Sequence, residues 1–174
     1  PELLEYSIGR LQHVYETLLK DNGGKHFVSI VPDKNYFLGE ANGYPHLDYG
    51  KLEELVVSGV GDRMEYVDIF DLLTVEDYYY TDTHWKQEEI IHIADALLSA
   101  MGAGETGEYT GHKIDGPFEG VYYGQLGLPV DTDELTYLTN PVLDGCIVTS
   151  YDTGKPQPAP MYDMEAAFGK DPYE

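Results

Sequence analysis

The sequence predicts a single domain of the α/β class, in which helices alternate with short buried strands. Two observations carry this prediction. Apolar residues recur at helical spacing in three separate segments, and short apolar runs lie between those segments. In addition, a chain of 174 residues with 42% apolar side chains can bury one core of ordinary size. The alternation ends near residue 104, so we expect an α/β part over residues 1–104 and a β- and loop-rich appendage over residues 105–174.

The first unit is a helix followed by a strand. Its helix shows apolar residues at three- and four-residue spacing, at Leu3, Leu4, Ile8, Leu11, Val14, Tyr15, Leu18 and Leu19. Residues 21–24, Asp-Asn-Gly-Gly, would end this helix. Residues 26–31 then form a continuous apolar run that is typical of a buried, parallel strand. Residues 32–34 follow at the carboxyl end of that strand, where open α/β sheets place functional loops.

Two further helices follow along the chain. Residues 48–58 predict a helix capped by Asp48, and residues 64–69 predict a strand that enters a short helical turn at 70–73. The third helix has its apolar positions at Ile90, Ile91, Ala94, Leu97, Leu98 and Met101, and Gly102 and Gly104 would stop it.

The appendage is punctuated by Gly, Pro, Asp and Thr around short apolar runs. Residues 121–123 and 146–151 favour strands over helices. Residues 151–155 predict a hairpin turn, and the prolines of 156–160 predict an extended segment. Cys146, beside an apolar run, is interpreted as a small buried residue.

Charge and composition exclude several classes of partner. The chain has 10 Lys and Arg against 32 Asp and Glu, a net charge of -22, which repels nucleic acid and anionic membrane surfaces. No run approaches the roughly 20 apolar residues that span a bilayer, so we expect no membrane insertion by this segment. One cysteine excludes an intramolecular disulfide and any multi-cysteine zinc cluster.

The residues that carry chemistry are Asp82 and His84. In an extended loop, two side chains separated by one residue fall on the same side, so the carboxylate can reach the imidazole. Such a carboxylate fixes the ring tautomer and leaves the other ring nitrogen to accept a proton from a nucleophile. Trp85 would wall the pocket or start the next helix. The simpler alternative is that Asp82 caps a helix beginning near Trp85, with His84 in its first turn.

The context of this motif resembles a known family. Residues 78–85, Tyr-Tyr-Tyr-Thr-Asp-Thr-His-Trp, followed by an amphipathic helix, resemble the signature of the DHHW proteins and of the alginate O-acetylation proteins, within the SGNH-hydrolase-like (GDSL-type) superfamily. Residues 27–34 resemble the family's strand ending in a Pro-x-Lys turn, and residues 118–123 resemble its F-x-G-x-x-Y stretch. Thr83 stands where DHHW proteins carry a second histidine, as in the alginate-type variant.

The resemblance implies a flavodoxin-like three-layer fold with a β-rich irregular insertion. It also implies O-acyl transfer or ester hydrolysis on a cell-surface glycan, with His84 as general base, Asp82 as its orienter, and neither metal nor cofactor. The partners would be a cell-surface polysaccharide or an acyl donor, and the location would be extracytoplasmic, either on the bacterial surface or secreted. We expect Trp85, Tyr80 and Lys34 to contact the substrate, although in a chain so acidic the sequence favours a pair between Lys34 and one of the many carboxylates.

The family's nucleophile is a serine in a later Asp-Ser block, and this sequence has no Asp-Ser pair. None of its serines, Ser7, Ser29, Ser58, Ser99 and Ser150, has the strand-to-helix setting of such a nucleophile. We therefore expect the chain to be a fragment that is incomplete at its C-terminal side and shows no turnover. The alternative is a non-catalytic surface module that binds glycan or protein, with Tyr78–Tyr80 and Tyr122–Tyr123 as an aromatic wall.

A metal site is a further alternative. His84, Glu88 and His92 are spaced four residues apart and would face one way on a continuous helix. Against it, His84 is expected to precede the helix, and neither H-E-x-x-H nor H-x-x-E-H occurs. The prediction is therefore that no metal binds.

Overall fold

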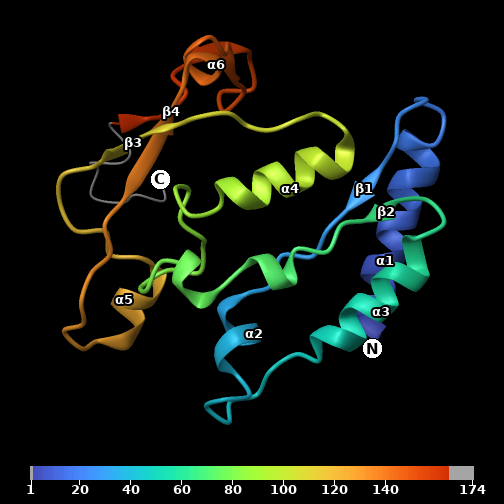
Figure 1. The fold of residues 1–174 in the computed structure, drawn as a ribbon, viewed down its shortest axis with the longest axis horizontal. Coiled ribbons are helices and arrows are strands. Elements are labelled where there is room, and N and C mark those ends of the chain that lie inside the picture. Colours follow the sequence, from blue (N-terminus) through green and yellow to red (C-terminus); the bar gives the residue numbers. More distant parts are fainter. Residues whose placement is uncertain (1, 165–174) are drawn as a thin grey trace.

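The computed structural model describes residues 2–164 and shows an α/β chain of six α-helices and six short strands within that range (Figure 1). The helices are α1 (Glu2–Val14), α2 (Lys34–Leu38), α3 (Tyr49–Val60), α4 (Ile91–Met101), α5 (Val121–Leu126) and α6 (Pro141–Asp144). The strands are β1 (Phe27–Val28), β2 (Glu65–Tyr66), β3 (Thr110–Lys113), β4 (Thr136–Thr139), β5 (Val148–Ser150) and β6 (Gln157–Ala159). A π-helical turn at Tyr15–Leu19 and 3-10 turns at Phe70–Leu72 and Val75–Asp77 complete the secondary structure.

The three long helices lie where the periodicity predicts them, and two of their ends have the expected caps. The Asp48 carboxylate accepts the backbone N–H of Lys51 at 2.9 Å at the start of α3. Gly102 ends α4 in the left-handed conformation, with φ of 70°, which glycine adopts without steric cost. The first helix differs in one respect, because its last turn is π-helical.

Both predicted segments contain a strand, and the two strands are parallel, since Phe27 pairs with Glu65 and Val28 with Tyr66. Each strand is only two residues long, and residues 26–30 are half-buried rather than buried as predicted. In Figure 1 this strand pair runs between the helices α1 and α3 on one side and α4 on the other. Alternation along each strand explains the arrangement, because successive side chains point to opposite faces. Val28 packs with α1 and α3, whereas Val67, which follows β2, packs with α4.

Two apolar clusters therefore flank the sheet. On the α1 and α3 side, the buried residues are Ile8, Val56 and Val60. On the α4 side, they are Ile69, Leu73, Tyr78 and Ile93, and the second cluster also receives Trp85. Because Tyr78 and Trp85 flank the Asp-x-His motif in sequence, the second core fixes the loop that carries the motif.

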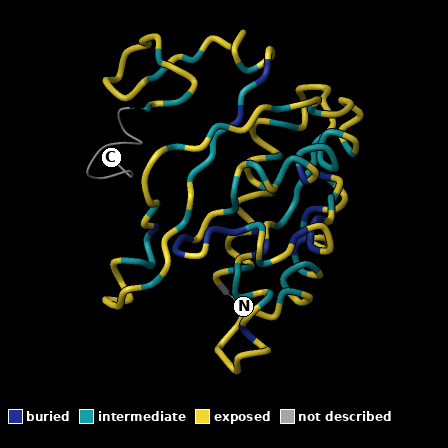
Figure 2. Tube along the Cα trace, turned by 60° about the vertical axis from the view of Figure 1, so that its left-hand side comes forward, coloured by how far each residue is buried: buried dark blue, intermediate teal, exposed yellow. Residues whose placement is uncertain are grey.

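The second half of the described chain contains two antiparallel strand pairs, β3 with β4 and β5 with β6. The predicted hairpin turn at 151–155 joins β5 to β6 and closes with a hydrogen bond from the Gly154 N–H to the Tyr151 carbonyl. Figure 2 shows that buried residues concentrate in the first half, while the chain near the C-terminus is mostly exposed or half-buried.

Two predictions for this half are wrong. Residues 121–123 form the first turn of α5 rather than a strand, because tertiary hydrogen bonds from the loop 81–82 hold the first N–H groups of that helix. Cys146 is exposed rather than buried. It follows the short helix α6, where its Sγ contacts the Val142 carbonyl at 3.3 Å, and the neighbouring Ile147 is 94% exposed.

Within residues 2–164, no helix is both long enough and apolar enough to cross a bilayer.

Candidate active site

The Asp-x-His motif lies at the tip of a hairpin-like turn. The Lys86 N–H donates to the Asp77 carbonyl at 2.7 Å, and Tyr78 and Trp85 form an antiparallel bridge. The Tyr79 N–H closes the tip by donating to the His84 carbonyl at 3.1 Å. The alternative in which a helix begins near Trp85 is therefore wrong, since α4 starts only at Ile91.

The predicted contact between the two motif side chains is present. Asp82 is 1% exposed, and its Oδ1 lies 2.5 Å from His84 Nδ1 and 2.9 Å from the His84 backbone N. Oδ2 accepts the Val121 N–H at 3.0 Å. Three N–H donors thus hold a carboxylate that is otherwise removed from water, which fixes its orientation relative to the imidazole.

The carboxylate also sets the tautomer of the ring. An ionised carboxylate only accepts hydrogen bonds, so Nδ1 of His84 carries the proton and Nε2 of the neutral ring has the free electron pair. The His84 side chain is 72% exposed, and among residues 2–164 no hydrogen bond reaches Nε2. The arrangement can therefore remove a proton from a group that approaches from solvent.

The F-x-G-x-x-Y stretch forms the wall behind Asp82. A Cβ on Gly120 would lie 2.5 Å from Asp82 Cβ and 2.5 Å from the Thr81 carbonyl oxygen, so only glycine allows this approach. The Gly120 N–H donates to Thr81 Oγ1 at 3.0 Å, and the Tyr122 N–H donates to the Thr81 carbonyl at 2.9 Å. The start of α5 is thus attached to both residues before the Thr83–His84 tip.

A residue that the sequence did not reveal completes the site. Asp133 accepts the backbone N–H groups of Tyr80 at 2.7 Å and Thr81 at 2.6 Å, and its Oδ2 also accepts the Thr81 hydroxyl at 2.6 Å. It lies 52 positions beyond Thr81 in the chain. No local pattern marks such a residue, because its role depends on the fold bringing two distant segments together.

Within residues 2–164, Lys34 does not form the carboxylate ion pair that the sequence favoured. Its Nζ donates to the carbonyls of Tyr79 at 2.8 Å and Tyr80 at 3.1 Å, and it lies 4.9 Å from the centre of the Tyr122 ring. Burial lowers the pKa of Lys34, and the negative charges of Asp133 and Asp82 partly oppose this effect. Lys34 therefore stabilises the loop that carries the motif, by donating hydrogen bonds to two of its backbone carbonyls.

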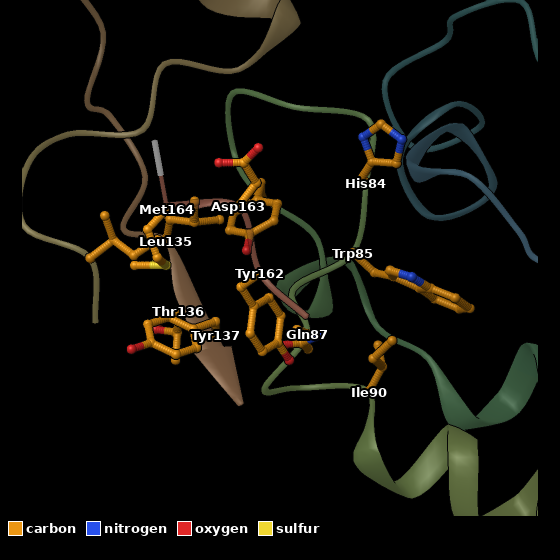
Figure 3. A pocket seen from close by; sticks show the side chains of 12 residues that line it. His84, Trp85, Gln87, Ile90, Leu135, Thr136, Tyr137, Tyr162, Asp163 and Met164 are labelled. Atoms are coloured by element: carbon orange, nitrogen blue, oxygen red, sulfur yellow. The ribbon is translucent and has the colours of Figure 1, made fainter. Parts of the chain in front are cut away.

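Of the predicted substrate contacts, only Trp85 shares a cavity with His84. Lys34 and Tyr80 line a separate cavity of about 350 Å³ together with Asp133. His84 and Trp85 line a cleft of about 430 Å³ and also border a smaller one. In Figure 3, His84 and Trp85 lie on one side of the larger cleft, and the Trp85 indole points away from the opposite wall.

The opposite wall of the larger cleft is aromatic and aliphatic, with its residues drawn from β4 and the segment before residue 165. Tyr137 stacks on His112 with a ring separation of 5.0 Å, and Tyr162 lies 5.0 Å from Tyr137. The Tyr162 hydroxyl donates to the Leu138 carbonyl at 2.7 Å. The predicted wall of Tyr78–Tyr80 and Tyr122–Tyr123 contributes only Tyr79 here.

Four of the five serine hydroxyls have hydrogen-bond partners other than His84. Ser29, expected to be structural, donates to the Val67 carbonyl at 2.8 Å. The hydroxyls of Ser7, Ser58 and Ser150 likewise have partners within four residues of their own positions.

The proposed metal geometry is also not formed. His84 lies before α4, whereas His92 lies within it and contacts the Leu72 carbonyl at 2.8 Å through Nε2. The three residues therefore do not share a helical face. Among the described residues, no group of three or more potential ligands is arranged to hold a metal ion.

Comparison with known proteins gives no relative, since no family model, no curated protein and no solved structure matches this chain.

Proposed function

We propose that Asp82 and His84 are the acid and base members of a serine-type acyl-transfer site, acting on O-acyl groups of a bacterial cell-surface glycan. The observation that carries the proposal is the 2.5 Å contact between a fully buried carboxylate and Nδ1 of an exposed imidazole. A histidine held in this way is ready to serve as a general base.

The chemistry assigned to the pair is conventional. His84 Nε2 would take the proton of a serine hydroxyl as its oxygen attacks the ester carbonyl, and the ester C–O bond would then break. The imidazolium would return that proton to the departing alcohol oxygen, while Asp82 stabilises the positive charge. Hydrolysis or transfer would follow from whether water or a sugar hydroxyl attacks the resulting acyl-serine.

The nucleophile is proposed to come from outside the five serines of this sequence, which leaves the 174 residues inactive alone. We further propose that the two-stranded parallel sheet belongs to a flavodoxin-like, SGNH-hydrolase-like three-layer fold. Its support is the placement of α1 and α3 on one face of β1 and β2, and of α4 on the other. An extracytoplasmic location at the bacterial surface belongs to the same proposal.

The test is an acetyl-ester assay on the full-length gene product. His84→Ala should lower kcat/KM by about 1,000-fold or more, because the base is lost. His13→Ala is the matched control, since His13 is an exposed histidine at the end of α1 and should keep full activity. Equal activity in wild type and His84→Ala would overturn the proposal. Turnover by the 174 residues alone that His84→Ala abolishes would keep His84 as the base, but it would overturn the placement of the nucleophile outside the five serines.

A second function, glycan binding without catalysis, is favoured by the aromatic cleft. Tyr79, Trp85, Tyr137 and Tyr162 line it, and aromatic side chains offer apolar faces on which sugar rings can stack. Trp85 is the one tryptophan of the sequence and borders the cleft, so its fluorescence reports changes at the edge of the cleft, although its indole points away from the opposite wall. If neutral oligosaccharides quench it in wild type and His84→Ala but not in Tyr137→Ala, the protein is a binder whether or not it is an enzyme.

A further inference from the structure

We infer that Asp133 is a positioning residue for the Asp82–His84 pair, acting through the backbone of residues 80–81. The inference rests on the proposed function only in treating this pair as catalytic. Asp133 accepts three hydrogen bonds of 2.6–2.7 Å from Tyr80 and Thr81, immediately before Asp82 in the chain. Bonds to an ionised carboxylate are among the stronger hydrogen bonds in proteins, so they fix the direction in which the chain enters Asp82.

Thr81 links the segment that Asp133 holds to the start of α5. It is 1% exposed; its Oγ1 accepts the Gly120 N–H, and its carbonyl accepts the Tyr122 N–H. Val121, between those two residues, donates its N–H to Asp82 Oδ2 at 3.0 Å. Asp133 therefore binds Thr81, Thr81 binds the start of α5, and the start of α5 binds the carboxylate of Asp82.

The backbone of Asp133 is itself held firmly. Its N–H donates to the Phe118 carbonyl at 3.0 Å, and its carbonyl accepts the Phe118 N–H at 2.8 Å. Phe118 in turn packs edge-on against Tyr79, with ring centres 5.0 Å apart. The carboxylate therefore projects from a paired segment next to the loop that it binds, as a rigid support for an active-site group requires.

The inference predicts that loss of the Asp133 carboxylate loosens the Asp82–His84 contact although Asp133 touches neither residue by hydrogen bond. A displacement of about 1 Å in a catalytic group can cost on the order of 100-fold in rate. We therefore expect Asp133→Asn in the full-length gene product to lower kcat about 100-fold with little change in KM. Asp131→Ala is the matched control, because Asp131 is an exposed acid two positions earlier.

A readout independent of activity is the NMR signal of the His84 Nδ1 proton, which a short bond to Asp82 shifts downfield. The signal is assigned by its loss in His84→Ala of the 15N-labelled chain. We expect it to disappear or move upfield in Asp133→Ala and in Thr81→Val, and to persist in Asp131→Ala and in Thr81→Ser, which keeps the hydroxyl. Amide spectra show whether each variant is folded, and Asp133→Asn replaces Asp133→Ala if the latter is not.

An unchanged Nδ1 proton signal in folded Asp133→Asn or Thr81→Val would overturn the inference. The NMR test of Asp133 and the esterase test of the proposed function can fail independently of each other. If His84→Ala retains full esterase activity, the catalytic proposal fails, but the NMR signal still decides whether Asp133 positions the pair.

Discussion

At the scale of single residues, the buried side chain of Tyr78 shows how the motif loop is held in place. Tyr78 is 4% exposed, and its hydroxyl donates to the carbonyl of Pro32, at the end of the segment that follows β1. Its ring belongs to the core cluster on the α4 side. This one side chain therefore ties the loop that carries Asp82 and His84 to the parallel sheet, through both packing and a hydrogen bond.

The burial of Tyr78 predicts a loss of stability at alkaline pH. Burial is the main cause that raises the pKa of Tyr78 from 10.0 to about 12. The unfolded chain ionises first, so the stabilisation is complete below pH 10 and declines by about 1.4 kcal/mol per pH unit between 10 and 12. In Tyr78→Phe, the free energy of unfolding should fall less steeply over this interval, although about 1 kcal/mol is lost at neutral pH with the hydrogen bond.

Urea unfolding at a series of pH values measures this slope. Tyr80→Phe is the matched control, because Tyr80 lies two residues away in the same loop and is 65% exposed. If Tyr78→Phe and wild type lose stability at the same rate between pH 10 and 12, the assignment to Tyr78 is wrong.

At the scale of elements, the site depends on how closely α5 approaches the loop 80–84. Gly120 allows this approach, while Gly124, on the same helix, has no atom within 4 Å of the position a Cβ would take. Neither glycine has positive φ, but Gly120 is the extended N-cap of α5, with φ of -68° and ψ of 179°, whereas Gly124 lies within the helix. Alanine at Gly120 therefore tests the effect of a steric contact, and alanine at Gly124 tests the effect of helix propensity.

We predict opposite effects of alanine at these two positions. Gly120→Ala should destabilise the fold by about 1–3 kcal/mol, because the new methyl group collides with Asp82 and with the Thr81 backbone. Gly124→Ala should be neutral or stabilising by up to about 1 kcal/mol, as expected for an exposed helical glycine. Thermal unfolding of both variants checks this, and a Gly120→Ala variant as stable as Gly124→Ala would contradict the close packing.

At the scale of the whole molecule, the net charge of -22 opposes compaction. The few cations interact locally, as in the contacts of Lys34 with the motif loop and in the Lys113–Glu134 pair at 2.6 Å between β3 and the segment just before β4. The chain has 32 acidic side chains against 10 Lys and Arg, so cations cannot match most of the carboxylates, and these repel one another through solvent, where salt screens them.

Salt should therefore stabilise this protein at neutral pH. Raising NaCl from about 0.01 M to about 0.5 M shortens the screening length several-fold, and we expect Tm to rise. The effect should shrink as the pH approaches the isoelectric point near 4.3, where net repulsion vanishes. Calorimetry at both pH values tests this, and a Tm that falls with NaCl at neutral pH would show that specific ion pairs outweigh net repulsion.

The sequence by itself determined the three long helices, the positions of the strands near Phe27 and Glu65, and the contact between Asp82 and His84. Each of these is set by residues close together in the chain, through apolar periodicity, caps or spacing. Only the tertiary structure decided the conformation of residues 121–123 and the roles of Asp133 and Lys34. Those depend on hydrogen bonds between segments 39 to 53 positions apart, which no local pattern encodes.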